Sequence, residues 1–322
     1  MSEVFSISRL LIGLIVLCAL GVAGLCASVV IVGLMLSSPH PSAIGPPPPD
    51  LPDARPVRIA SGSGSVLGGW WIAGSRGGGC VVLMHGVRAN RLSMARRARM
   101  LRENGVSVLL FDFQAHGESA GRRITFGHLE ALDAAAAVAF ARERVPEERV
   151  GVIGISLGGA ASLLGTGLLP VDALVLESVY PDIDAALSNR LRAHLGPLIG
   201  AVFTPVLTPL FKLLLPPILG VGPAQLRPID RIAAVTAPVL IASGTVDAHT
   251  PLSEAEALFA RAREPKQFWA VAGAGHVDLE LHDPEGYRRT VLPFIMRNVQ
   301  SNACRDPRIT PASVTPEHRP SR

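Results

Sequence analysis

One serine stands in a local sequence suited to nucleophilic chemistry. Residues 154–158 read Gly-Ile-Ser-Leu-Gly, which places Ser156 at the centre of a G-x-S-x-G pattern. An apolar run typical of a buried strand, Val150–Ile155, precedes it, and small residues compatible with a helix follow. A sharp strand-to-helix turn strains the backbone at the serine, so the flanking positions must be glycine to avoid clashes. The pattern predicts that Ser156 is a nucleophile held at the carboxyl edge of a sheet.

A serine hydroxyl needs a base, and the base needs a carboxylate that orients it. Two downstream segments place such groups shortly after predicted strands. Asp247 closes the sequence GTVD at 244–247, and His276 closes the sequence GAGH at 273–276. The chain order Ser, Asp, His is expected when the three residues follow successive strands of one sheet. We therefore predict that Ser156, Asp247 and His276 form a catalytic triad.

Other side chains compete for these roles. His116 lies in a turn, where a structural packing role is the simpler interpretation. His249 and His282 lie shortly after the predicted acid and base, but neither directly follows a strand end. Glu177 ends another predicted strand and is the alternative acid. A group of arginines near the first predicted helix of the domain offers a site for an anionic substrate, although a solvated helix face is the simpler interpretation: Arg88, Arg91, Arg96, Arg97 and Arg99.

The elements that must position these residues alternate along the chain. Between residues 56 and 300, short apolar runs follow one another with helical stretches between them. This alternation is typical of an α/β fold with a mostly parallel central sheet and helices on both faces. The predicted strands are 57–60, 67–73, 80–84, 106–111, 150–155, 173–176, 239–243 and 267–271, and the predicted helices are 93–103, 129–144, 253–263 and 285–299.

Residues 56–300 resemble the α/β-hydrolase superfamily, in its serine-esterase and lipase-like branch. The matching motifs are His-Gly at 85–86, DFQAHGES at 112–119, the serine turn, GTVD and Gly-His at 275–276. The resemblance implies that Ser156 is the nucleophile, His276 the general base and then acid, and Asp247 its orienting carboxylate. It also implies that the backbone N–H groups of Val87 and Leu157 form the oxyanion hole. Serine at this position points to acyl transfer to water through an acyl-enzyme, whereas relatives with a carboxylate or cysteine there carry out other reactions.

The composition predicts a membrane segment. Hydrophobic residues make up 48% of the chain, charged residues only 17%, and the mean hydropathy is +0.37. Residues 10–36 contain no charged side chain, and a helix of about 20 apolar residues is enough to cross a bilayer. We predict an uncleaved transmembrane helix in the N-terminal segment 1–36 in preference to a signal peptide, whose apolar region spans only about 7–15 residues. Arg9 favours a cytoplasmic N-terminus, with the catalytic domain on the exported or periplasmic side.

Three further segments have distinct compositions. Residues 37–55 are rich in proline and predict a semi-rigid polyproline II spacer, and residues 301–322 predict a disordered tail. The insertion at about 181–229 contains a long apolar stretch that could by length cross a membrane. A crossing there would separate Ser156 from Asp247 and His276, so we predict a helical cap over the site. A sharper hypothesis is that its inner face binds an acyl chain and its outer face contacts lipid.

These features together predict a membrane-anchored serine hydrolase. We expect it to cleave small-molecule or lipid acyl esters in the manner of a carboxylesterase, lipase or thioesterase, with no cofactor and no metal. The net charge of +4 forms no basic stripe, so nucleic acid is not the expected partner. Two alternatives stay open: a non-catalytic binding or scaffold protein on the same fold, and a serine peptidase or acyltransferase with the same triad.

Overall fold

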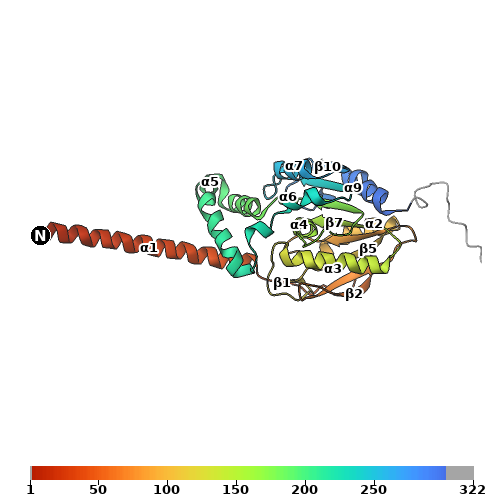
Figure 1. Ribbon diagram of the computed structural model, residues 1–322, viewed down its shortest axis with the longest axis horizontal. Helices are drawn as coiled ribbons and strands as arrows, with labels where there is room; N and C mark the ends of the chain where they lie inside the picture. The colour runs from red at the N-terminus through yellow and green to blue at the C-terminus, as the bar shows by residue number, and fades with distance from the viewer. Residues whose placement is uncertain (1, 302–322) are drawn as a thin grey trace, which may run out of the picture.

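The computed structural model describes residues 2–301, with side chains described from residue 11 onward. The predicted disordered tail therefore lies outside the described residues from residue 302 on. The centre of the molecule is an eight-stranded sheet in the order β10-β9-β8-β7-β4-β5-β3-β2 (Figure 1). Its strands are β2 (Arg55–Ala60), β3 (Val66–Ile72), β4 (Cys80–Met84), β5 (Ser107–Phe111), β7 (Val150–Ile155), β8 (Ala173–Glu177), β9 (Val239–Gly244) and β10 (Lys266–Val271).

The sheet is parallel from β5 to β10, and only β2 and β3 run antiparallel to their neighbours. Strands β4, β5, β8 and β9 are buried along their whole length, as expected of strands covered on both faces. One apolar core lies under α3 (His128–Arg144), α4 (Leu157–Leu163) and α7 (Leu252–Arg261), and a second lies under α2 (Ala95–Glu103) and α9 (Pro284–Val299). The predicted α/β architecture is confirmed.

Between β8 and β9 the chain leaves the sheet and forms α5 (Ile183–Leu219), followed by the short α6 (Pro228–Arg231). Helix α5 has two arms, because Gly196 adopts φ 75° and ψ 172° and interrupts the helical backbone. Glycine tolerates this left-handed φ, and Pro197 then begins the second arm at a position where its missing N–H costs no hydrogen bond. The second arm turns back toward the end of α1 (Figure 1).

The N-terminal helix α1 (Ser2–Leu36) extends away from the domain and meets it only near its C-terminal end (Figure 1). There it contacts α5, and Val29 is buried. Two helices in the described part of the chain have the length and apolar composition to cross a membrane, namely Leu11–Leu36 and Ile183–Leu219. The first coincides with the predicted transmembrane helix.

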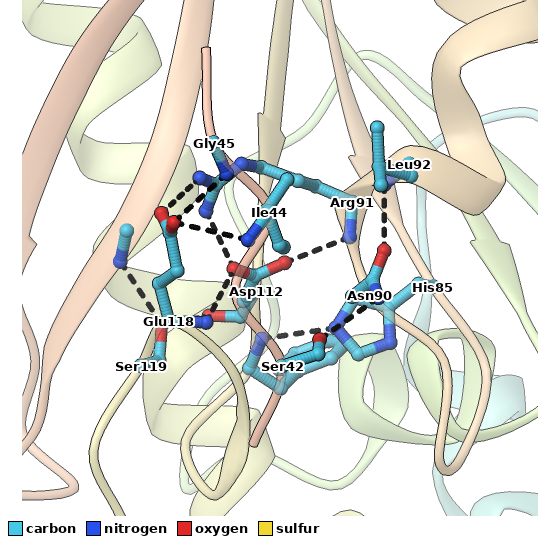
Figure 2. A network of polar contacts seen from close by, with 12 residues as sticks. Ser42, Ile44, Gly45, His85, Asn90, Arg91, Leu92, Asp112, Glu118 and Ser119 are labelled. Atoms are coloured by element: carbon cyan, nitrogen blue, oxygen red, sulfur yellow. Dashed lines mark hydrogen bonds and ion pairs between the residues drawn. The ribbon is translucent and has the colours of Figure 1, made fainter. Parts of the chain in front are cut away.

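Residues 37–55, predicted from their composition to be a semi-rigid spacer, lie against the domain. Strand β1 (His40–Pro41) pairs in parallel with β6 (His116–Gly117), and Leu51 is fully buried. Figure 2 shows the backbone N–H groups of Ile44 and Gly45 directed at Glu118, whose Oε1 accepts both at 3.2 Å. A proline-rich chain has few backbone hydrogen-bond donors. Here the N–H groups of His40 and Ser42, like those of Ile44 and Gly45, find acceptors on the domain. The segment therefore fixes the end of α1 against the domain.

Candidate active site

Ser156 lies in the turn between β7 and α4 with φ 49° and ψ −108°, a strained backbone for a residue that carries a side chain. The two glycines of the pattern permit this turn through close packing. A Cβ atom on Gly154 would lie 2.6 Å from the backbone nitrogen of Gly159, and one on Gly158 would collide with the carbonyl oxygen of Met84. The turn thus holds Ser156 at the carboxyl end of β7, as the sequence pattern predicts.

The structure brings Asp247 and His276 into contact. The Nδ1–H of His276 donates to Oδ2 of Asp247 at 2.8 Å, and the hydroxyl of Thr250 donates to the same oxygen at 2.7 Å. The N–H groups of His249 and Thr250 donate to Oδ1 at 2.8 and 2.9 Å. Burial by itself would raise the pKa of Asp247, but the hydrogen bonds and charge of His276 and the bonds from Thr250 outweigh it and lower that pKa to about 2. The carboxylate is therefore ionised and holds a proton on Nδ1 of His276, which leaves Nε2 as the acceptor when the ring is neutral.

Ser156 is placed after β7, Asp247 after β9 and His276 after β10, all at the carboxyl edge of the same sheet. Within residues 2–301, no hydrogen bond joins Ser156 to His276. Catalytic hydrogen bonds of this kind are often long in a site without substrate and shorten when the substrate binds. The carboxylate–imidazole half of the predicted triad is thus formed, and the serine is held separately by its turn.

The competing histidines make other contacts. His116 is fully buried, its Nε2 accepts the N–H of Arg88 at 3.1 Å, and its Nδ1–H donates to a backbone carbonyl at 2.9 Å. His282 donates from Nε2 to a backbone carbonyl at 3.1 Å. The ring of His249 lies beside that of the predicted base His276, with 5.1 Å between their centroids and an interplanar angle of 51°, and His249 donates to Asp247 only through its backbone N–H. Of these histidines, only His276 has its ring hydrogen-bonded to a carboxylate.

The alternative acid Glu177 is engaged elsewhere. Its Oε2 accepts from Arg97 at 2.7 Å and its Oε1 accepts the hydroxyl of Tyr287 at 2.6 Å, and all three side chains are buried. The other arginines near α2 also have partners: Arg88 donates to the carbonyl of Met35, Arg91 pairs with Asp112 and Glu118 (Figure 2), Arg96 pairs with Glu280, and Arg99 pairs with Asp50. Most of this group therefore serves the fold rather than an anionic substrate.

A cavity of about 110 Å³ opens beside Ser156. The two residues proposed for the oxyanion hole, Val87 and Leu157, line it, and their backbone N–H groups have no acceptor among residues 2–301. The rest of the lining is mainly apolar and comes from the loop before α3, from the end of β8 and from α5. Three of the lining residues were not expected from the sequence: Leu36 at the end of α1, Phe126 before α3 and Tyr180 after β8. No local pattern marks them as part of a site, because the fold alone brings their segments to the serine. Arg190 lies in the insertion at 181–229 that the sequence predicts over the site.

The described part of the chain holds no cluster of three or more His, Cys, Asp or Glu side chains that could bind a metal ion. The buried His85 of the His-Gly motif accepts the N–H of Phe113 at Nε2, 3.1 Å away, and burial lowers its pKa to about 3. His85 is therefore neutral and holds the neighbouring loop in place.

Comparison with known proteins agrees with this architecture. Residues 76–212 match a hydrolase family described as serine aminopeptidase, S33. The uncharacterized protein MT2364 of Mycobacterium tuberculosis is 35% identical over 255 residues, which cover 79% of this chain and 82% of that protein. The α/β-hydrolase domain-containing protein WAV2 of Arabidopsis thaliana is 30% identical over 212 residues, which cover 64% of this chain and 65% of that protein. Among solved structures, the esterase Pf2001 of Pyrococcus furiosus superposes with a TM-score of 0.66 at 25% identity, covering 81% of this chain and 98% of the esterase.

The chain belongs to the α/β-hydrolase superfamily. The hydrolase family and the esterase of the same fold together support hydrolase activity for this protein.

Proposed function

We propose that the protein is a membrane-anchored serine hydrolase that cleaves acyl esters. The observation that carries the proposal is Ser156 itself, held at φ 49° in its strand-to-helix turn and lining a mainly apolar cavity. The hydrogen-bonded pair of Asp247 and His276 at the same sheet edge supplies the base that such a serine needs.

The proposed reaction follows from these positions. Oγ of Ser156 attacks the acyl carbonyl while Nε2 of His276 takes its proton, and the backbone N–H groups of Val87 and Leu157 stabilise the oxyanion, at about 2.7–4 kcal/mol per donor. His276 then protonates the leaving alcohol as the bond between carbonyl carbon and alcohol oxygen breaks. Water attacks the acyl-enzyme and gives a proton to Nε2 of His276. His276 returns that proton to Oγ of Ser156 as the bond between Oγ and the acyl carbon breaks and the carboxylic acid leaves. Asp247 keeps the ring oriented and stabilises its charged form throughout.

The membrane part of the proposal rests on α1. Its apolar stretch Leu11–Leu36 is long enough to cross a bilayer, and its side chains over most of that length are exposed. Such a surface is stable in hydrocarbon and costly in water. Arg9 before the apolar stretch favours a cytoplasmic N-terminus, which places the hydrolase domain on the exported side.

A second candidate is peptidase activity, which the name of the matching family favours. An aminopeptidase must bind the positively charged amino terminus of its substrate. The charged residues that line the cavity at Ser156 are Arg88 and Arg190, and no carboxylate lines it within residues 2–301. That lining repels an ammonium group, so ester hydrolysis is the better-supported activity.

The test is labelling with a fluorophosphonate together with hydrolysis of p-nitrophenyl esters by the full-length chain in detergent. We expect Ser156→Ala to abolish labelling and to lower kcat by about 10³-fold or more without unfolding the protein. Ser162→Ala is the matched control, because Ser162 lies in the same helix α4 and its hydroxyl donates only within that helix.

Failure of a folded wild-type protein to react would favour the binding or scaffold alternative. Hydrolysis that survives Ser156→Ala would mean that another residue is the nucleophile. A preference for aminoacyl amides over esters would favour the peptidase.

A further inference from the structure

We propose that α1 is more than an anchor: its C-terminal end forms one wall of the acyl pocket, and the substrate is a membrane lipid whose acyl chain reaches Ser156 between α1 and the second arm of α5. This inference rests on the proposed serine hydrolase activity and assigns its substrate class.

The first observation is a pair of adjacent, mainly apolar cavities between the serine and α1. A second cavity of about 30 Å³ lies between α1 and α5. It shares Leu36, Phe126 and Leu187 with the cavity at Ser156, so the two are adjacent. Its remaining lining is Gly33 of α1 and apolar side chains of the second arm of α5, with no charged residue among them. A hydrocarbon chain is the ligand that such a path fits.

The second observation is that the end of α1 is held at this place. The guanidinium of Arg88 donates to the carbonyl of Met35 at 3.0 Å, and the N–H of Ile124 donates to the carbonyl of Ser37 at 2.8 Å. Ser37 is buried, and β1 follows directly with its pairing to β6. These bonds flank Leu36 on both sides, so its position in the cavity wall is set by the domain as well as by the helix.

The third observation concerns the outer surface of the second arm of α5. This surface is apolar and exposed beside an apolar helix, and the arm runs across the direction of α1 rather than along it (Figure 1). The single charged residue of 197–219, Lys212, pairs with Asp184 at 2.6 Å. The exposed apolar residues follow a helical spacing: Leu198, Ile199, Val202, Phe203, Val206 and Leu213.

The lipid bilayer is the occupant that fits this surface. A helix that crosses the membrane along α1 brings the arm to the boundary between headgroups and acyl chains, where an exposed apolar face is buried. The cavity between α1 and the second arm of α5, which we call the seam, then opens toward the acyl chains of the bilayer. A lipid can slide its chain into the seam with its ester at Ser156, without the chain passing through water.

Gly33 offers a direct test, because it lines the seam and a Cβ atom there would lie 3.4 Å from Cδ1 of Ile218. Gly33→Leu fills the seam from the α1 side. Gly24→Leu is the matched control, since a Cβ at Gly24 has no neighbouring heavy atom within 4 Å. The full-length proteins are reconstituted in phosphatidylcholine vesicles, and kcat/KM is measured for palmitoyl and acetyl esters of one alcohol.

We expect Gly33→Leu to lower the palmitoyl-to-acetyl ratio of kcat/KM by about tenfold or more, and Gly24→Leu to leave both values unchanged. Leu36→Ala acts in the opposite direction, because the shorter side chain in the wall enlarges the pocket. It is expected to raise the palmitoyl-to-acetyl ratio of kcat/KM. Labelling by a small fluorophosphonate reports separately on Ser156.

A protein that labels and hydrolyses acetyl esters, but whose ratio does not respond to Gly33→Leu or Leu36→Ala, would overturn the acyl path and leave the hydrolase intact. A folded protein that neither labels nor hydrolyses any ester would instead overturn the proposed function.

Discussion

The buried carboxylates of Asp247 and Glu177 have different hydrogen-bond partners, and these partners support different roles for the two residues. Asp247 accepts a hydrogen bond from His276 at Oδ2, and its Oδ1 accepts the backbone N–H groups of His249 and Thr250. Glu177 is bonded to Arg97 and Tyr287, and Arg97 also pairs with Asp278 at 2.8 Å. The first carboxylate holds the imidazole of His276, as the proposed triad requires, and the second neutralises the buried guanidinium of Arg97.

We therefore predict opposite phenotypes for the two amide substitutions. Asp247→Asn is expected to lower kcat by about 10⁴-fold, because the amide no longer holds the reactive tautomer of His276, while stability changes little. Glu177→Gln is expected to lower the free energy of unfolding by about 3 kcal/mol, because it leaves the buried Arg97 with less compensating charge. Ester kinetics and urea unfolding of both variants measure this. If Glu177→Gln were stable but inactive and Asp247→Asn were active, Glu177 rather than Asp247 would be the carboxylate that catalysis needs.

At the scale of elements, the serine turn depends on how closely α4 approaches β4. Gly158 lies against the carbonyl of Met84, at the end of β4, and leaves no room for a Cβ atom. Glycine is required here by the contact between two elements rather than by a positive φ. The long α5 shows the other use of glycine, since Gly196 takes a left-handed φ that divides the helix into two arms.

Substitution of Gly158 tests the element contact. Gly158→Ala is expected to lower the free energy of unfolding by about 3 kcal/mol, because α4 must move away from β4 to admit the methyl group. Gly222→Ala is the control, since the nearest heavy atom to a Cβ there is 3.8 Å away and the residue has φ −88°. Chemical unfolding followed by circular dichroism gives both values. A Gly158→Ala protein as stable as the control would contradict the close packing of this turn.

At the scale of the whole molecule, α1 and the domain form a continuous structure. Residues 37–55 pair with the domain, bury Leu51 and direct backbone N–H groups at Glu118 (Figure 2). The domain is therefore held close to the end of α1 instead of standing off on a spacer. In a membrane, this arrangement keeps α5 and the site near the bilayer surface.

The proposed membrane anchor leads to a prediction about the whole chain. Val22 and Leu25 lie near the middle of Leu11–Leu36 and are exposed. The double variant Val22→Arg, Leu25→Arg is expected to be released from membranes by alkaline carbonate, since each arginine costs about 2.5–3.5 kcal/mol at the centre of a spanning helix. The wild-type protein and a Val22→Leu, Leu25→Ile control are expected to stay in the membrane pellet. Release of the wild-type protein would contradict a spanning α1.

The sequence by itself determined the features that depend on neighbouring residues. Runs such as Val150–Ile155 identify buried strands because every side chain in them must be apolar, and the glycines around Ser156 identify a turn because only glycine fits its contacts. The order of strands and helices then indicated the fold, since parallel strands require helical crossovers. Each strand or turn signal lies within a few residues along the chain, and the fold follows from their order.

Only the tertiary structure decided which distant groups meet. Asp247 and Glu177 are both carboxylates at strand ends, and only their contacts with His276 and Arg97 show which of the two meets the histidine. The proline-rich segment reads as a spacer by composition, yet its backbone donors and Leu51 find partners on the domain. Leu36 enters the cavity wall at Ser156 although 120 residues separate the two. Such contacts are set by the packing of whole elements, and packing depends on the folded geometry of the entire chain rather than on any local pattern.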